Sequence, residues 1–585
     1  MLFVCALLAA LAASAPAAII RVKTTGNDTN DGSTWPLAKR TVQAAINTAV
    51  TGDEIWVAKG LYVEPSGSLT TTCDVALYGG FNGTETAREQ RDWNKYITIL
   101  DGNNAVRVLT IWPQATSATI IDGFAIRNGA STGQGAGIYS DGGAPVIRNN
   151  VVTACRVDWA YVSASGAGLY LRGGAAVAQG NCIKENPQGN GVYANRKACI
   201  QGNVISGNGG SGIRCEGDEV VIEENLIVGN GATNGYAAGG LEMVNSSSVV
   251  RHNVFVGNHG AAIRALSGAP VIVGNTVVSN SGAGFDNDEA ARARVVNNIL
   301  AFNEGCGISN DYGLPWLAGN CVYSNAGGNY SGAIAGYQDI TADPRFVGLE
   351  AGDYRLRPVS PCIDAGYEFS DPDPDGTRAD IGARPYFHLA AVKVLPDGTQ
   401  VSLSSIAVTS GTSDEAGMFV QDTAGRAGLR VQGASDLASG STLDLTGVMQ
   451  TDSATGERYL SAIVALPAFA EQMPGVAFIA CRWLGGGVFG SGAVTQPGVE
   501  GGVGLNTIGL LVRLAGRVKA SLPGALTLDD GSGVPVQVSV PAGVAVPSGA
   551  FVRVTGISSS FTDGGGHLRP SLLCRTALDV VTVAE

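Results

Sequence analysis

Charged side chains are scarce in this sequence, and no cluster of basic residues occurs in it. Only 15% of the 585 residues are Asp, Glu, Lys or Arg, and the formal net charge is -13. Because nucleic-acid binding needs a clustered basic surface, we expect no nucleic-acid partner. Beyond the first residues, no stretch reaches the ~20 apolar residues of a transmembrane helix, so we expect no membrane span.

Cysteine pairs with metal-binding spacing are also missing. The 11 Cys residues include no Cys-x-x-Cys pair, which argues against a metal site built on thiolates. Cys182, Cys199 and Cys321 occupy positions of a repeat that its other copies fill with apolar residues. We interpret them as small packing residues, and disulfides formed after export are the alternative.

Asparagine and glycine are abundant and regularly spaced. A phrase with two Asn residues five positions apart recurs, and its first Asn stands at positions 181, 203, 225, 253, 275, 298 and 320. The intervals of 22, 22, 28, 22, 23 and 22 residues indicate a solenoid rather than a globular domain. We expect each Asn column to hydrogen-bond from coil to coil, and Asn also tolerates the left-handed backbone of a sharp corner.

A second phrase precedes each Asn phrase by about twelve residues, from Gly137-Ile-Tyr139 to Gly307-Ile-Ser309. Each period therefore contains two short runs that alternate apolar and polar residues, and such runs predict strands. Stacked coils of this kind form a parallel β-helix, with about 22 residues per coil. The predicted fold class is all-β.

The N-terminal segment, residues 1–18, reads as a secretory signal peptide. An apolar core from Leu2 to Ala13 precedes the small residues Ser14 to Ala18, although the usual basic start is missing. We therefore expect a secreted or cell-surface protein. Residues 19–135 are predicted to form the N-terminal cap and first coils, with a short capping helix within 41–50 and the first strand-like run from Asp53.

Two flanking regions carry a family resemblance. The run from Leu77 to Thr86 with Ile99-Leu-Asp-Gly102, and the later Ser360-Pro-Cys-Ile-Asp-Ala-Gly366, resemble bacterial secreted β-helix proteins of the pectate-lyase-like superfamily. The resemblance implies a right-handed parallel β-helix, with regular coils at 136–340 and a closing segment at 341–387. Members include polysaccharide lyases and hydrolases as well as proteins of unknown activity. The polygalacturonase signature is incomplete here, because its nearest match, Asn258-His259-Gly260, lacks the acidic pair.

One outward side chain per coil follows the second phrase, and these side chains form the predicted site. The column reads Tyr139, Tyr170, Tyr193, Arg214, Glu242, Arg264, Asp286 and Ser309. We expect the three Tyr and Arg214 to bind substrate, since rings stack on sugar faces and Arg binds carboxylates. Glu242, Arg264 and Asp286 are the candidate catalytic residues, because two coils separate the carboxylates by ~9 to 10 Å. The alternative is a charge ladder that only stabilises the sheet.

A candidate Ca²⁺ site lies in the closing segment. Asp371, Asp373 and Asp375 stand at alternate positions before Gly376, and Asp380 follows. Carboxylates in this pattern converge on a hard cation, although the acidic residue expected at the twelfth position is replaced by Gly382. The alternative is an acidic, Pro-rich turn. No other cofactor is expected.

After residue 387 the repeat stops and two similar blocks of short strands follow. We predict OB-like β-barrels at 388–470 and 508–585, joined by a linker or additional strands at 471–507, with Ala391–Gly398 as the first strand. With 11 basic and 15 acidic residues from 388 onward, a glycan or protein contact is favoured over nucleic acid, and a spacer role is the alternative.

The functional expectation is therefore an exported protein that binds polysaccharide or cell-envelope material, without need for catalysis. The competing expectation is a polysaccharide lyase or glycoside hydrolase that works on the Tyr139 to Asp286 face. The sequence leaves the oligomeric state open.

Overall fold

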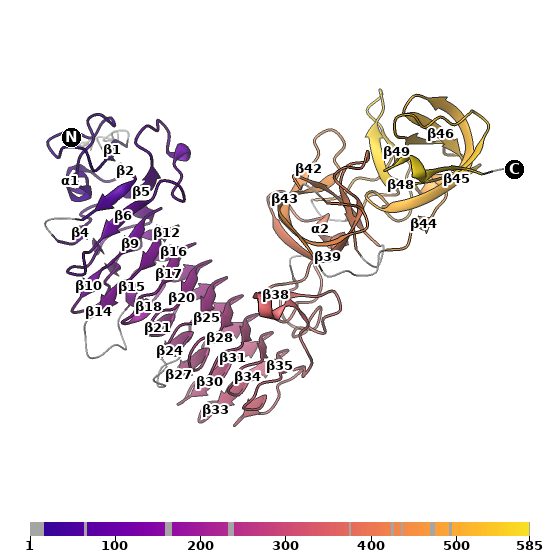
Figure 1. The fold of residues 1–585 in the computed structure, drawn as a ribbon. Coiled ribbons are helices and arrows are strands. Elements are labelled where there is room, and N and C mark those ends of the chain that lie inside the picture. Colours follow the sequence, from indigo (N-terminus) through magenta and orange to yellow (C-terminus); the bar gives the residue numbers. More distant parts are fainter. Residues whose placement is uncertain are drawn as a thin grey trace, which may run out of the picture. The chain divides into compact units, whose positions relative to one another are not determined.

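The computed structural model describes residues 17–63, 67–157, 166–231, 239–373, 376–422, 426–434, 437–468, 474–490 and 494–583. Nearly all of the predicted signal peptide lies outside these residues. The chain forms two compact units: Met1–Pro344 with Ile381–Ala383, and Arg345–Asp380 with Arg384–Glu585 (Figure 1). No helix in the described ranges is both long and apolar enough to cross a membrane.

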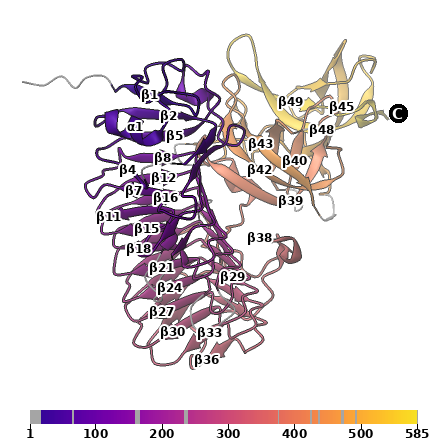
Figure 2. The same ribbon diagram turned by 60° about the vertical axis from the view of Figure 1, so that its left-hand side comes forward.

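The first unit is a parallel β-solenoid, as predicted, but it has three parallel sheets rather than the two strand runs per coil that the sequence indicated (Figure 2). The two predicted runs form sheets B and C, and the sheet A strands of the repeat were not predicted. Sheet A contains β1 (Ile19–Val22), β2 (Glu54–Ala58), β5 (Ala76–Phe81), β8 (Ile120–Asp122), β12 (Val146–Arg148), β16 (Val177–Gln179), β19 (Cys199–Gln201), β22 (Val221–Glu223), β25 (Val249–Arg251), β28 (Val271–Val273), β31 (Arg294–Val296) and β34 (Trp316–Ala318). Sheet B contains β3 (Gly60–Tyr62), β6 (Thr98–Asp101), β9 (Ala125–Arg127), β13 (Val151–Thr153), β17 (Cys182–Lys184), β20 (Val204–Ser206), β23 (Leu226–Val228), β26 (Val254–Val256), β29 (Thr276–Val278), β32 (Ile299–Ala301) and β35 (Cys321–Tyr323). Sheet C contains β4 (Leu69–Thr70), β7 (Leu109–Ile111), β11 (Ile138–Asp141), β15 (Gly166–Arg172), β18 (Asn190–Asn195), β21 (Ile213–Glu216), β24 (Leu241–Val244), β27 (Ile263–Leu266), β30 (Phe285–Asp288), β33 (Ile308–Asn310) and β36 (Tyr330–Ser331).

The interior of the solenoid is a continuous apolar core. Strand residues alternate between the interior and the surface, and the register places like residues above one another, as with Ile200, Ile222 and Val250 in sheet A. All three are fully buried. Burial of each such side chain contributes roughly 1.5–3 kcal/mol, so the stack of coils accounts for much of the fold's stability.

The two Asn columns form buried hydrogen-bonded ladders, which confirms the predicted structural role. Asn203 Nδ2 donates to Asn225 Oδ1 at 2.9 Å and to the carbonyl oxygen of Ala178 at 2.9 Å. The left-handed backbone, however, belongs to the residue before each ladder Asn, as at Gly202 (φ 63°) and Glu224 (φ 58°). The ladder Asn residues thus bridge coils while their predecessors make the corner.

The described cysteines form no disulfides. All ten described Cys residues are free thiols. Of the three Cys residues interpreted as packing residues, Cys321 is fully buried, whereas Cys182 and Cys199 are half-buried at outward positions of their strands. The packing interpretation therefore fits Cys321 best.

A short helix covers the N-terminal end of the core, as the sequence indicates. Helix α1 (Val42–Thr48) begins at the N-cap Thr41, whose hydroxyl accepts the backbone N–H of Ala44 at 3.3 Å. Its buried face consists of Val42, Ala45 and Ile46. The first strand, β1, precedes this helix, so the predicted start of the sheet near Asp53 was too late.

The remaining elements are short. In the first unit, β10 (Ala130–Ser131) pairs with β14 (Arg156–Val157), and the 3-10 turn η1 (Arg88–Gln90) lies between β5 and β6. In the closing segment, β37 (Phe346–Gly348) pairs with β38 (Asp353–Leu356), and η3 (Leu349–Ala351) joins them. The second barrel's sheet also contains β44 (Ala477–Phe478) and β50 (Val580–Thr582), and the turns η4 (Cys481–Trp483) and η5 (Ala577–Asp579) lie in the same part of the chain. Residues Ile381–Ala383 return to the solenoid, where the backbone N–H of Gly382 donates to Asn297 O at 2.8 Å and that of Ala383 to Thr276 Oγ1 at 2.9 Å.

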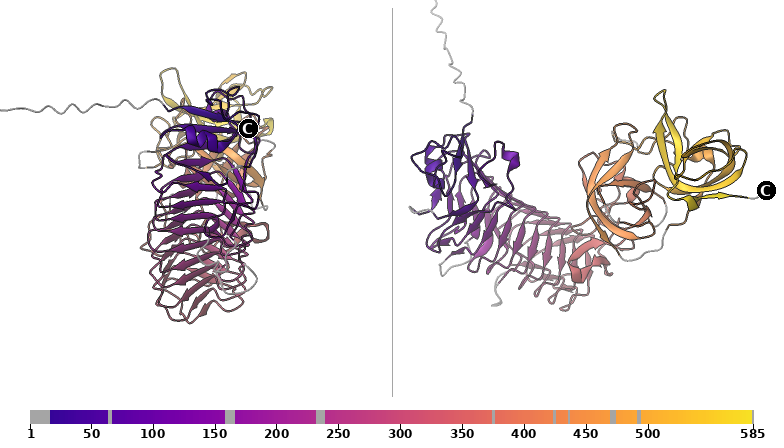
Figure 3. Two further views of the ribbon diagram at one scale, coloured as in Figure 1. Left: turned by 90° about the vertical axis from the view of Figure 1, so that its left-hand side faces the viewer. Right: turned by 45° about the horizontal axis from the view of Figure 1, so that its top comes forward.

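The second unit contains two five-stranded barrels with one topology (Figure 3). The first has β39 (Gln400–Ser410), β40 (Phe419–Gln421), β41 (Gly428–Gln432), β42 (Thr442–Thr451) and β43 (Arg458–Pro467), and the second has β45 (Leu511–Leu522), β46 (Ala525–Asp529), β47 (Val536–Ser539), β48 (Phe551–Thr562) and β49 (Leu568–Leu573). In each barrel the third strand pairs in parallel with the fifth, β41 with β43 and β47 with β49. This order is that of an OB-like barrel.

The predicted first strand of barrel 1 was wrong. Residues 389–392 form the short helix α2 (Leu389–Val392), and the first strand is β39 instead. Leu389, Val392 and Leu395 face the barrel core, and Lys393 is buried beside them. Its Nζ donates to the carbonyl oxygen of Ile508 at 2.6 Å, so α2 links barrel 1 to the start of barrel 2.

Candidate functional site

The strands that carry the predicted outward column follow one another in sheet C (Figure 2). The register pairs each residue with the next in adjacent strands, in the order Tyr139, Tyr170, Tyr193, Arg214, Glu242, Arg264, Asp286 and Ser309. Sequence spacing alone thus brings all eight side chains onto one face. Their exposure, however, differs from the predicted open surface.

The three Tyr rings stack on one another. The centroids of Tyr139 and Tyr170 lie 5.1 Å apart and those of Tyr170 and Tyr193 lie 4.8 Å apart, with interplanar angles of 3° and 7°. The Arg107 guanidinium covers Tyr139 at 4.2 Å from the ring centroid. Tyr170 and Tyr193 are only 2% and 4% exposed. The ring faces are therefore taken by other protein groups, and the expected stacking of sugars on open Tyr faces does not fit this geometry.

Arg214 begins a ladder of ion pairs that continues from the tyrosines. Its guanidinium binds Glu216 in the same strand at 3.0 Å and also pairs with Glu242 in the next coil. Glu216 also accepts the Tyr193 hydroxyl at 2.8 Å. The Arg214 and Glu242 side chains are nearly buried, so neither has the exposure expected of a free binding or catalytic group.

Arg264 repeats this arrangement one coil after Glu242. Its Nε lies 3.2 Å from Asp286 Oδ2, and its Nη2 lies 2.6 Å from Asp288 Oδ2. Burial raises the pKa of Asp286; Arg264 opposes this rise, whereas Asp288 and Asp311 add to it. The pKa of Asp288 is lowered, first by the backbone N–H of Glu289 and then by Arg264. The pKa of Asp286, a member of the predicted catalytic set, is thus raised.

Glu216 and Asp288 are parts of this ladder that the sequence prediction missed. Each stands two positions after a predicted residue, Arg214 and Asp286 respectively. Because strand side chains alternate, residues two apart share a face. This period was available in the sequence and would have identified both residues.

The acidic segment of the closing region lies in the second unit. The two carboxylate oxygens of Asp380 accept the backbone N–H groups of Asp364 and Tyr386 at 2.7 and 2.5 Å, while its own N–H donates to Asp373. Burial, together with Asp373 and Asp364, raises the pKa of Asp380 to about 7. Asp375 lies outside the described residues.

These contacts bear on whether the acidic segment can bind a cation. Both oxygens of Asp380 are occupied by backbone donors, which is the pattern of a closed turn. Within the described residues, no group of three or more His, Cys, Asp or Glu side chains is arranged to hold a metal ion. The predicted Ca²⁺ site therefore stays a prediction.

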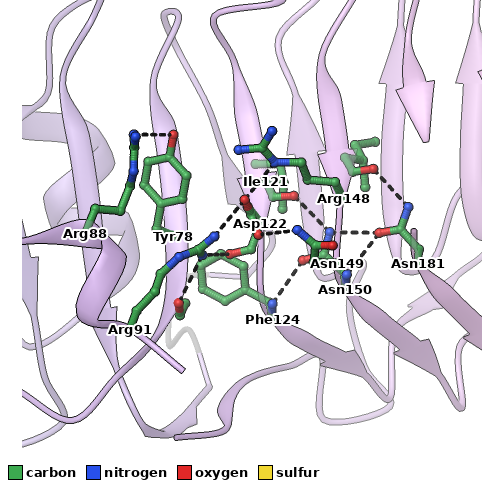
Figure 4. A network of polar contacts seen from close by, with 12 residues as sticks. Tyr78, Arg88, Arg91, Ile121, Asp122, Phe124, Arg148, Asn149, Asn150 and Asn181 are labelled. Atoms are coloured by element: carbon green, nitrogen blue, oxygen red, sulfur yellow. Dashed lines mark hydrogen bonds and ion pairs between the residues drawn. The ribbon is translucent and has the colours of Figure 1, made fainter. Parts of the chain in front are cut away.

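A second polar network lies on the outer face of sheet A, near the N-terminal cap (Figure 4). The buried Asp122 carboxylate binds Arg91 at 2.8 Å and Arg148 at 2.7 Å, and Arg88 Nη1 donates to the Tyr78 hydroxyl at 3.1 Å. Every group in this network has a protein partner. We therefore interpret it as a structural clamp that holds the loop containing Arg88 and Arg91 on sheet A.

Comparison with known proteins identifies the solenoid. Residues 109–270 match the family described as right handed beta helix region. No curated protein sequence matches the chain significantly. Among solved structures, the pectate lyase Pel9A shares 16% identity at a TM-score of 0.45, covering 63% of this chain and 97% of that one.

Two epimerase structures show a weaker similarity. The periplasmic alginate epimerase AlgG shares 11% identity at a TM-score of 0.31, covering 50% of this chain and 78% of that one. The A-module of the Azotobacter vinelandii mannuronan C-5 epimerase AlgE6 shares 15% identity at a TM-score of 0.27, covering 52% and 96%. The family model and the sheet topology together show a right-handed parallel β-helix, and two small OB-like β-barrels follow it in the chain.

Proposed function

We propose that this protein is exported and binds polysaccharide or cell-envelope glycan along the outer face of sheet C, without chemical turnover. The observation that supports this proposal is the row of polar side chains along sheet C, in which Glu216, Arg264, Asp286, Asp288 and Ser309 keep part of their surface exposed. A row with the regular ~4.8 Å strand spacing offers repeated hydrogen-bonding groups to an extended polymer. The groups are held in fixed positions by their ion pairs.

Binding is favoured over turnover because the ladder groups already have partners. Glu242 is held by Arg214, and Asp286 and Asp288 share Arg264. A general base or nucleophile needs a free position next to the substrate. Rigid ion pairs with few exposed atoms are better suited to binding a glycan than to transferring a proton.

The proposal is tested by titrating the purified protein with a panel of acidic, neutral and amino polysaccharides in a calorimeter. Ser309→Trp adds bulk to sheet C, and Ser206→Trp adds the same bulk to an outward position of sheet B as the matched control. We expect Ser309→Trp to weaken binding at least about fivefold by steric exclusion. Failure of every polysaccharide to bind, or equal losses in both variants, would contradict the proposal.

The second candidate function is polysaccharide cleavage by a lyase or hydrolase, and Asp286 is the observation that favours it. Its raised pKa next to Arg264 resembles the environment that prepares a carboxyl as a general acid. In this candidate Glu242 is the second carboxylate and Arg264 stabilises developing negative charge.

Turnover is measured on the same polysaccharides by following ultraviolet absorbance for unsaturated products and the formation of reducing ends. Activity that is lost in both Arg264→Ala and Asp286→Asn but kept in Glu219→Gln, a residue of the turn after β21 whose carboxylate pairs with Lys197, would establish an enzyme. The absence of product across the panel, with binding intact, would leave the binding function.

A further inference from the structure

Three turns that leave sheet C for sheet A carry an exposed patch at the C-terminal end of the solenoid. Residues 289–293 join β30 to β31, residues 311–315 join β33 to β34, and residues 332–336 follow β36 (Figure 1). The first two turns are hydrogen-bonded to each other, because the backbone N–H of Leu314 donates to Ala291 O at 3.0 Å. We define the turn patch as the exposed side chains of Glu289, Arg292, Asp311, Tyr312, Leu314 and Ile334.

The centre of the turn patch is apolar. Tyr312, Leu314 and Ile334 are 83%, 73% and 86% exposed. The turn that holds Ile334 packs directly on the one that holds the other two, since a Cβ at Gly332 would lie 2.0 Å from the carbonyl oxygen of Asn310. A single exposed apolar residue needs no explanation, but neighbouring large ones mark an interaction surface.

Charges of opposite sign lie on opposite sides of this centre. Glu289 and Asp311 are exposed at the sheet C end of their turns, whereas Arg292 is exposed at the sheet A end. Arg294, also exposed, begins β31 and stacks over the Trp316 ring at 4.8 Å from its centroid. Within the described residues, none of these two carboxylates and two guanidinium groups forms an ion pair. The patch therefore has an acidic side and a basic side that its own chain does not neutralise.

This arrangement is complementary to itself under a twofold axis. An axis that runs through the apolar centre, parallel to the solenoid, brings the acidic side of one copy onto the basic side of the other. Glu289 of each copy then faces Arg292 of the second copy, and the apolar centres meet on the axis. Twofold interfaces match residues reciprocally in this way, and an apolar centre inside a polar rim is their usual anatomy.

We propose that the turn patch is the interface of a homodimer in which two copies lie side by side with parallel solenoids. A uniformly acidic or uniformly basic partner would meet like charge on one side of the patch, whereas a second copy of this chain meets opposite charge on both. The inference goes beyond the proposed glycan-binding function and does not rest on it, because the patch lies in the turns and not on the outer face of sheet C.

The test measures the oligomeric state of the full-length protein by sedimentation velocity over a range of concentrations. We expect a monomer–dimer equilibrium for the unmodified chain. Arg292→Glu and Glu289→Arg should each weaken the dimer at least about tenfold, because each variant places two like-charged pairs across the axis. An equimolar mixture of the two variants should form the dimer again, since both pairs then have opposite signs.

Glu304→Arg is the matched control. Glu304 is an exposed residue of the turn between β32 and β33, outside the turn patch, and its reversal makes the same change in charge. We expect this variant to dimerise as the unmodified protein does. Circular dichroism melting of each variant shows whether the solenoid is folded.

The remaining outcomes would overturn the inference. A protein that stays monomeric at every concentration has no such interface. A dimer that persists in both charge variants is joined by another surface, and loss of the dimer without recovery in the mixture contradicts the twofold arrangement. Glycan binding is measured separately with Ser309→Trp, so failure of either proposal leaves the other standing.

Discussion

The ladder Asn residues show how one side chain can hold two coils at once. Asn225 accepts from the backbone N–H and the amide of Asn203, and it donates to Ile200 O at 2.8 Å and to Asn253 Oδ1 at 2.9 Å. We expect Asn225→Ala to lower the free energy of unfolding by about 3 kcal/mol, because it leaves buried donors and acceptors unsatisfied. Urea unfolding followed by circular dichroism measures this loss.

Asn94→Ala is the control for the ladder prediction. Asn94 is exposed in the loop after Asp92, outside both ladders. We expect a change within about 0.5 kcal/mol there. A ladder variant no less stable than this control would show that the coil-to-coil amide bonds contribute little.

Lys393 makes stability depend on pH. Burial lowers the pKa of Lys393 to about 8, whereas an unfolded Lys titrates near ~10.4. Between these values the unfolded chain binds more protons than the folded chain, so stability rises with pH. We expect a rise of up to about 3 kcal/mol between pH ~8 and ~10.5 in the unmodified protein.

Lys393→Met removes the titrating group and provides the comparison. The difference in unfolding free energy between the two proteins, measured by urea titration at several pH values, should change over this pH range. Parallel curves would mean that Lys393 titrates normally in the folded protein, despite its burial.

At the scale of elements, repetition determined what could be predicted. The Asn phrases recur with almost constant spacing, so the strands of sheets B and C, their register and their outward residues all followed from the sequence. The barrel strands lack such a repeat. Residues 391–398 have the alternation of a strand, yet Leu389 and Val392 pack on the barrel core from helix α2, and Leu395 packs there from the turn that follows it. That choice depends on tertiary packing, which local pattern does not contain.

The sequence predicted which residues form the candidate site and on which face they lie, but it did not predict how exposed their side chains are. The sequence places Tyr170 on the outer face of sheet C, but it carries no information on whether neighbouring rings cover it. The stack of Tyr139, Tyr170 and Tyr193 and the pairing of Arg214 with Glu216 result from the ~4.8 Å spacing of coils, which brings large outward side chains into mutual contact. Long outward side chains that lie in register on neighbouring strands therefore stack or pair with one another, and this contact reduces their exposure.

The Tyr stack is expected to stabilise sheet C. Tyr170 is almost fully buried between two parallel rings. We expect Tyr170→Ala to cost about 3–5 kcal/mol, since it removes a buried ring and both stacking contacts. Tyr170→Phe keeps the ring and should cost less than about 1.5 kcal/mol. Thermal unfolding measures both variants, and similar losses for Ala and Phe would assign the effect to the hydroxyl instead.

At the scale of the whole molecule, the acidic closing segment decides whether a cation stabilises the protein. If Ca²⁺ binds near Asp371, Asp373 and Asp380, calorimetric titration should show heat, and the melting temperature should rise with Ca²⁺ concentration because the ion binds the folded state. Asp373→Asn should reduce both effects. Neither heat nor a shift in melting temperature would identify the segment as a Pro-rich turn closed by backbone N–H groups.

The segment Ile381–Ala383, in which the chain returns to the solenoid, also affects the molecule as a whole. Ile381 is fully buried, Gly382 packs on Ile299, and the N–H groups of Gly382 and Ala383 donate to Asn297 and Thr276. These contacts cover part of the outer face of sheet B near its last coils.

The solenoid also has an apolar core separate from those of the barrels, which predicts that it can fold without them. We therefore expect a fragment of residues 17–387 to unfold cooperatively, and a fragment of residues 17–380 to melt several degrees lower, because the loss of one buried Ile and two hydrogen bonds costs about 3 kcal/mol or more. Differential scanning calorimetry compares the two fragments, with Ile381→Ala in the longer one as the matched intermediate. Identical melting temperatures would show that the returning segment only rests on the solenoid, whereas failure of both fragments to fold would show that the barrels are needed for its stability.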